Sequence, residues 1–217
     1  LAKYPRDIRR DMAAAGRNGV DCVFIPSDKE MYPAGDSTFV DVRGLGDNLC
    51  GRFRPGHFRG VATVVAKLFN IVMPHTAYFG QKDAQQAVII KRLALDMCAG
   101  VDVRVLPTVR ESDGLAASSR NVYLSKSERK DALCLIRSIR LARRMVKAGI
   151  RNTAKITDEI KKVIDGTPSA RVQYINIVDP GTLADVATIR GKALLAMAVF
   201  IGKTRLIDNT MLGDVRE

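Results

Sequence analysis

The sequence predicts an α/β fold: a parallel sheet with covering helices, followed by a small C-terminal α+β domain. Two observations favour this. Up to Pro107, helix-like and strand-like segments alternate along the chain, as they do in βαβ units. After Pro107, helices are followed by a run of strand-like segments, which is typical of an α+β arrangement. We therefore expect one domain at residues 1–108 and a second at residues 109–217.

The elements of the first domain follow from hydrophobic spacing and from turn residues. Apolar residues at i, i+4 and i+7 predict helices, and a short apolar run that ends at Pro26 is typical of a buried strand. Asp83 and Gln86 form a candidate capping box. The expected elements are a helix at 8–15, a buried strand at 20–25, an exposed strand at 39–42, a helix at 61–69, a strand at 77–79, a helix from 83 and a strand at 101–106.

The second domain opens with a polar, irregular stretch at residues 108–123. Ser125 and Glu128 form a capping box for a long helix that runs through Val146 and is closed by Gly149. The remaining expected elements are a helix carrying Ile156, Ile160, Val163 and Ile164, and strands at 172–178, 194–201 and 205–207.

Composition excludes several classes of protein. With 47% hydrophobic and 27% charged residues, the 217-residue chain is not disordered. Its longest apolar run, residues 193–202, is about half of what a membrane helix needs. Residues 1–10 are charged and interrupted by proline, unlike a secretory signal, and the four cysteines form no C-x-x-C pair. We therefore expect a cytoplasmic protein with reduced thiols and no zinc site.

The formal charge of +12 would suit an anionic partner. Nucleic acid is not favoured, because the basic residues are dispersed, the chain has no tryptophan and aromatic residues make up only 6%.

Residues 79–86 (Phe-Gly-Gln-Lys-Asp-Ala-Gln-Gln) lie where an expected parallel strand meets a helix. Ligands of open α/β sheets bind at the carboxyl ends of strands, and helix N-termini favour phosphate. Gly80 would allow close backbone approach, and Lys82 adds a positive charge. The alternative is a solvated turn with a capped helix.

Two more segments could bind anions. Residues 107–121 form a long polar loop in which Ser118 and Ser119 precede Arg120, a set of donors suited to phosphate. Residues 52–60 place three arginines and His57 just ahead of an apolar helix. The alternatives are an interdomain linker and a basic cap on a surface loop.

With these segments in view, the chain resembles the pantothenate synthetase (pantoate–β-alanine ligase) family. The motifs that carry the resemblance follow the family's order across nearly the whole chain; they are Tyr4-Pro5-Arg6, residues 54–61, residues 78–83 with Gln85-Gln86, residues 107–111, residues 113–115, residues 118–121 with residues 123–125, and residues 204–209.

The resemblance implies a Rossmann-like nucleotidyl-transferase domain, a small C-terminal domain and a homodimer. It implies that pantoate is adenylated by ATP with Mg²⁺ and that β-alanine then displaces AMP. Pantothenate for coenzyme A is the product, and no nucleic acid or membrane takes part. The site residues it implies are Phe79, Gly80, Gln81, Lys82, Asp83, Val109, Ala117, Ser118, Ser119 and Arg120 for ATP; Lys82, Ser118, Ser119 and Arg120 for catalysis; Gln86, Arg54 and Tyr4 for pantoate; and Asp83 for the metal.

Two departures from the family's pattern bear on activity. The family's N-terminal His-x-Gly-His segment is absent from this sequence, and Ala117 stands where the family usually has Met. We therefore expect these 217 residues alone to be inactive. The alternative functions are another adenylate-forming nucleotidyl transferase of the same superfamily and a non-catalytic basic protein that binds nucleic acid.

Overall fold

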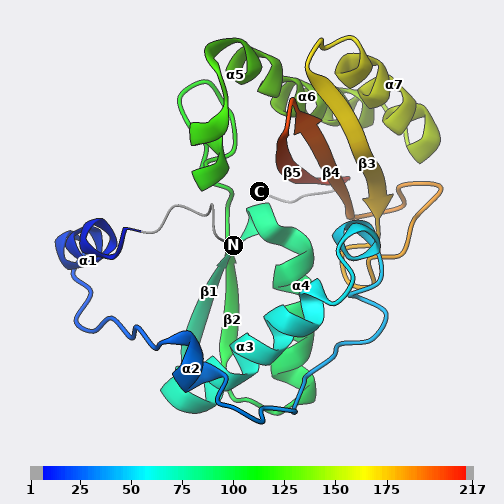
Figure 1. Cartoon of the computed structure of the whole chain (residues 1–217). Helices are drawn as coiled ribbons and strands as arrows, with labels where there is room; N and C mark the ends of the chain where they lie inside the picture. Colours follow the sequence, from blue (N-terminus) through cyan, green and yellow to red (C-terminus); the bar gives the residue numbers. More distant parts are fainter. Residues whose placement is uncertain (1–6, 214–217) are drawn as a thin grey trace. The chain divides into compact units, whose positions relative to one another are not determined.

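The computed structural model describes residues 7–213, and by its internal contacts the chain divides into residues 1–38 and residues 39–217. Figure 1 shows the elements of each part, and each part is described by itself below. None of the helices in residues 7–213 is both long enough and apolar enough to cross a membrane.

The first part contains two short helices. The predicted N-terminal helix is confirmed as α1 (Ile8–Arg17), whose N-cap Asp7 accepts a hydrogen bond from the Arg10 amide at 3.0 Å. Helix α2 (Asp28–Met31) has a complete capping box formed by Ser27 and Glu30.

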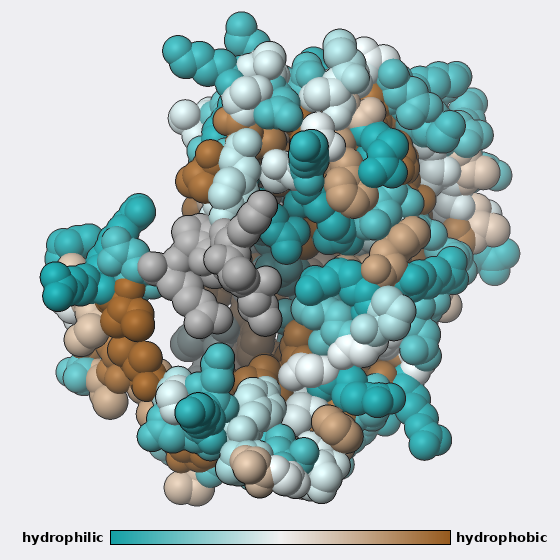
Figure 2. Space-filling model, viewed as in Figure 1, coloured by the Kyte–Doolittle hydropathy of each residue, from teal (hydrophilic) through white to brown (hydrophobic). Residues whose placement is uncertain are grey.

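The predicted buried strand at residues 20–25 is wrong. The segment belongs to no strand, and its large apolar side chains are about half exposed. Figure 2 shows this segment as a hydrophobic surface patch. An apolar run becomes a strand only where a neighbouring strand accepts its backbone hydrogen bonds, and within the described residues this one has no such neighbour.

The second part begins with the predicted alternation of helix and strand. Helix α3 (His57–Val72), strand β1 (Thr76–Gly80), helix α4 (Ala84–Asp96) and strand β2 (Asp102–Leu106) follow one another. Strands β1 and β2 pair in parallel, from Thr76 opposite Asp102 to Gly80 opposite Leu106, which confirms the predicted parallel pairing. Helices α3 and α4 contribute most of the core on which these strands pack.

Two local predictions in this region are wrong. Residues 39–42 form no strand; instead the Val40 amide donates to Thr63 Oγ1 at 3.0 Å and ties the segment to α3. Asp83 makes no capping hydrogen bond to α4, because a 3-10 turn, η2 (Gln81–Asp83), leads directly into the helix. The Asp83 backbone is therefore not in the extended conformation of a usual N-cap.

The C-terminal elements are α5 (Lys126–Ala132), α6 (Cys134–Lys147), α7 (Thr153–Asp165), β3 (Ala170–Val178), β4 (Ala193–Ile201) and β5 (Thr204–Leu212). The Ser125–Glu128 capping box is confirmed. The single long helix predicted from it is instead two helices, because a tight turn in which the Leu133 amide donates to the Lys130 carbonyl separates α5 from α6.

The three C-terminal strands form one antiparallel sheet in the order β3-β4-β5. Helices α6 and α7 pack on it, and the core between them holds fully buried residues such as Ile139, Ile160 and Met197. Strand β5 also contacts the η2 turn and a second 3-10 turn, η3 (Ser119–Tyr123), so the antiparallel sheet adjoins the segments expected to bind ATP.

Candidate active site

The carboxyl ends of the parallel strands bring the first two motifs together. Because Gly80 pairs with Leu106, the η2 turn after β1 and the loop after β2 start side by side. The space beside Gly80 is open: a Cβ atom built there would meet nothing within 4 Å. This edge is where open α/β sheets bind ligands.

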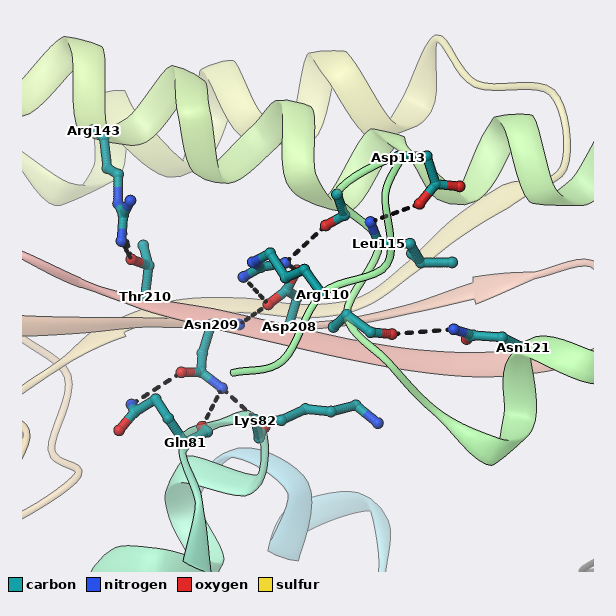
Figure 3. A network of polar contacts seen from close by, with 12 residues as sticks. Gln81, Lys82, Arg110, Asp113, Leu115, Asn121, Arg143, Asp208, Asn209 and Thr210 are labelled. Carbon is teal, nitrogen blue, oxygen red and sulfur yellow. Dashed lines mark hydrogen bonds and ion pairs between the residues drawn. The ribbon is translucent and has the colours of Figure 1, made fainter. Parts of the chain in front are cut away.

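Asn209 of β5 holds the η2 turn. Its Nδ2 donates to the carbonyl oxygens of Gln81 and Lys82, both at 2.9 Å, and its Oδ1 accepts from Gln81 Nε2 at 3.0 Å. Figure 3 shows the Lys82 side chain extending away from Asn209. The turn is therefore fixed through its backbone and the Gln81 side chain, while the Lys82 ammonium extends away from Asn209.

The loop of residues 107–121 is also anchored on β5. Arg110 forms a two-pronged ion pair with the buried carboxylate of Asp208, at 2.8 and 3.0 Å. Within the loop, Glu111 and Asp113 both accept from Arg129 of α5, and these hydrogen bonds hold the pKa of each carboxyl below its usual range. These charged groups, which made the loop look like a ligand site, hold its shape.

The Ser118–Arg120 segment begins η3. Ser118 Oγ accepts from the Arg120 amide at 3.2 Å and caps the turn. Arg120 Nη1 donates to the Arg205 carbonyl at 3.1 Å, and Ser119 is exposed. The segment is therefore held to β5 at Arg120 while its hydroxyls stay at the surface.

Of the three arginines in residues 52–60, only Arg54 joins the site. Arg52 donates to Asn48, and Arg59 forms an exposed ion pair with Asp41. Arg54 lies just before α3, where Gly56 occupies the left-handed N-cap at φ 74°, and its Nη1 lies 2.9 Å from His57 Nε2. Since a guanidinium can only donate, Nε2 accepts this bond and the neutral ring carries its proton on Nδ1.

Several charged side chains affect the pKa of His57. Its pKa lies below the usual value, first because of burial and then because of Arg54, Arg205 and Arg120, while Asp83 acts in the opposite direction. Arg54 contacts His57, and Arg120 contacts the backbone of Arg205. These four residues and Asp83, which belong to α3 and the segment before it, η2, η3 and β5, are here called the charged cluster. Three guanidinium groups against one carboxylate make this cluster suited to an anion.

Arg205 was not predicted as a site residue. Its Nε donates to Gln173 Oε1 at 2.7 Å, which fixes the guanidinium beside Tyr174. Tyr174 stacks on Phe53, and burial raises the pKa of its phenol to about 12. Sequence reasoning also missed Asp208 and Asn209, although all three lie in the 204–209 segment that carries part of the family resemblance.

The other predicted residues are spread around this edge. Phe79 packs into the core of α3 and α4, Val109 is 73% exposed, and Gln86 and Ala117 are half-buried. Asp83 is exposed, and among residues 7–213 no three acidic, histidine or cysteine side chains gather as a metal site. Tyr4 lies outside the described residues. These assignments stay predictions, as does the domain boundary near Thr108.

Comparisons with known proteins identify the family of the chain. A family profile described as pantoate-beta-alanine ligase matches residues 1–211. The pantothenate synthetases of Moorella thermoacetica and Pelotomaculum thermopropionicum are 52% and 53% identical over 98% of this chain, which spans 75% and 76% of their lengths.

The structure resembles solved members of the same family. The pantothenate synthetase of Thermus thermophilus superposes with a TM-score of 0.92 at 44% identity, over 96% of this chain and 75% of that one. A pantoate-beta-alanine ligase of Francisella tularensis, solved with beta-gamma ATP and beta-alanine, gives a TM-score of 0.75 at 32% identity over 98% of this chain and 72% of that one. The predicted fold class is confirmed, and this chain belongs to the pantoate–β-alanine ligase family.

Proposed function

We propose that the charged cluster and Lys82 bind the phosphates of ATP while the family's reaction, the ligation of pantoate to β-alanine, takes place. The observation that carries this is that strand β5, which bears Arg205, contacts both the η2 turn with Lys82 at the carboxyl end of β1 and the η3 turn with Arg120. The Francisella relative solved with beta-gamma ATP supports a nucleotide at this kind of site.

The proposed roles follow from position and chemistry. Ser118, Ser119 and Arg120 offer two hydroxyl donors and a forked cation to phosphate oxygens. Val109, which is 73% exposed in the loop that follows β2, provides an apolar surface for the adenine. Gln86, in the first turn of α4, and Arg54 would hold pantoate through an amide and a guanidinium.

The reaction then has two steps. A carboxylate oxygen of pantoate attacks the α-phosphorus of ATP, an O–P bond forms and pyrophosphate leaves with the bonding electrons. The neutral amine of β-alanine next attacks the acyl carbon, loses a proton and displaces AMP. In both steps charge moves onto phosphate oxygens, and fixed cations such as Lys82 and Arg120 stabilise it without rearranging.

Asp83 is the proposed carboxylate ligand for Mg²⁺. Mg²⁺ in nucleotide sites takes only one or two carboxylates and completes its shell with phosphate oxygens and water, so a single exposed carboxylate beside the phosphate site fits it. When bound, the ion would neutralise phosphate charge. We also expect the protein to be a cytoplasmic homodimer; sedimentation velocity would check the dimer.

The test is ATP–pyrophosphate exchange driven by pantoate in a protein that carries the family's N-terminal His-x-Gly-His segment ahead of residues 1–217, here called the whole protein, because these residues alone are expected to be inactive. Lys82→Ala should lower the exchange rate about 100-fold, as for loss of a preorganised electrostatic contact. Lys91→Ala is the matched control, since it removes the same charge from an exposed position on α4. The proposal fails if both variants exchange at the wild-type rate, or if other carboxylic acids drive exchange as well as pantoate does.

A further inference from the structure

Both segments expected to contact ATP are attached to two adjacent residues of one strand. Asn209 holds the η2 turn through three hydrogen bonds, and Asp208 holds the 107–121 loop through the paired Arg110. Figure 3 shows the two contacts side by side on β5. In sequence the partners lie 128 and 98 residues apart, so the two contacts join segments that only the tertiary fold brings together.

Strand β5 is a rigid support for these contacts. It pairs along its whole length with β4, where Asn209 lies opposite Ala196 and Asp208 opposite Met197. Asn209 itself is only 5% exposed, and its backbone N–H donates to Asp208 Oδ1 at 2.8 Å. Because this side chain is held in place, its hydrogen bonds fix the η2 backbone relative to the sheet.

The contacts of Asn209 fit positioning better than ligand binding. Its Nδ2 has two hydrogens and both are used, on the carbonyls of Gln81 and Lys82, while its Oδ1 accepts from Gln81. A substrate oxygen that accepts from Nδ2 would have to displace one of the two carbonyls. The Lys82 side chain points away from Asn209, so the amide controls where the Lys82 backbone lies without engaging its ammonium.

We propose that Asn209 is a positioning residue for adenylation: it fixes the Gln81–Asp83 turn on β5 so that Lys82 is held at the reacting phosphates. The proposal rests on the role of Lys82 given above. Since a misplacement of about 1 Å can cost about 100-fold in rate, loss of this contact should act on catalysis as well as on stability.

The experiment compares Asn209→Ala with Thr210→Val in the whole protein. Thr210 is the next residue of the same strand, equally buried, and its Oγ1 accepts from Arg143 of α6 at 2.6 and 3.0 Å, so T210V loses hydrogen bonds but does not touch η2. Both variants should lower the thermal midpoint. Only N209A should lower kcat for pantoate-driven ATP–pyrophosphate exchange, by about tenfold, with a smaller change in the KM for ATP.

Asn209→Ser provides a second variant, which guards against a failure of N209A to fold because its hydroxyl keeps one donor at the buried position. One hydroxyl hydrogen cannot replace both bonds from Nδ2 to the carbonyls of Gln81 and Lys82. We expect a fall in kcat in the same direction as in N209A and no larger.

A double variant separates this inference from the proposed function. If Asn209 acts through Lys82, K82A with N209A should exchange no more slowly than K82A alone. The inference is overturned if the losses in K82A and N209A multiply fully in the double variant, or if the N209A rate lies within twofold of the T210V rate. A slow K82A variant would still support the proposed function in either case. A K82A variant with normal exchange would overturn both.

Discussion

The two sheets of residues 39–217 differ in burial. In the antiparallel sheet, every residue of β4 is buried except Phe200. In the parallel pair, no residue of β1 or β2 is fully buried, and Tyr78 and Leu106 are 59% and 50% exposed. The segments proposed to bind ATP follow β1 and β2, so the proposed site lies at the edge of the less buried sheet.

This contrast explains how the site is held. Loops at the carboxyl edge of a parallel sheet are free to meet a ligand, but they have few contacts of their own. Here they obtain rigidity from the other sheet, through Asp208 and Asn209 of β5. The antiparallel sheet therefore contributes to the site mainly as a support.

The strongest predicted loss of stability tests this contrast in burial directly. Leu195→Ala in β4 removes a side chain that is 0% exposed and should lower the free energy of unfolding by about 3 kcal/mol. Val103→Ala in β2 removes a half-buried side chain and should cost about 1 kcal/mol or less. Urea unfolding of both variants measures the two losses, and equal losses would show that the two sheets contribute alike to stability.

The second prediction refines the contrast between support and site within α4. Gln85 is 7% exposed, accepts from the Cys50 amide, and donates to the carbonyls of Leu45 and Asn48. Gln85→Ala should lower the free energy of unfolding by about 2 kcal/mol, because it removes the side-chain partner of the half-buried Cys50 amide and Leu45 carbonyl.

Gln86, the next residue of α4, should affect substrate binding rather than stability. Gln86→Ala should leave unfolding nearly unchanged and raise the KM for pantoate by about tenfold, the loss of a hydrogen bond or two, with little effect on ATP. Steady-state kinetics with each substrate varied in turn measures this. Equal weakening of pantoate and ATP would make Gln86 a structural residue.

The weakest predicted effect concerns pH. The pKa of His57 is lowered by burial and by Arg54, so between that pKa and the usual value near 6.5 the unfolded chain binds more protons than the folded one. Stability should therefore rise as the pH rises through this window; as the pH falls, this contribution is lost within the window and does not change further below it. Denaturant midpoints between about pH 5 and 8 should depend less on pH in His57→Gln than in the wild type.

His75→Gln serves as the control for the His57 experiment, because the chain has only two histidines and His75 is exposed. The same pH dependence in H57Q and in the wild type would show that the pKa of His57 is not lowered in the folded protein.

Elements with a strong local signal were predictable. The apolar stripe of α3, the Ser125–Glu128 capping box and the three C-terminal strands all appear in the structure, since each depends on residues close in sequence. The errors concern features that depend on neighbours. The apolar run at residues 20–25 has no strand beside it, and the η2 turn deprives Asp83 of its capping conformation.

The family could be recognised from the amino-acid sequence alone, because motifs such as residues 79–86 and 118–121 depend only on residue type and order. The same motifs placed Lys82 and Arg120 next to turns that could bind phosphate. The folded molecule was needed to show that Arg110, Glu111 and Asp113 hold the loop together, that Arg205 is held by Gln173, and that Asn209 holds the η2 turn. This is because a side chain's role depends on its partner, and here the partners come from strands and turns up to 128 residues apart.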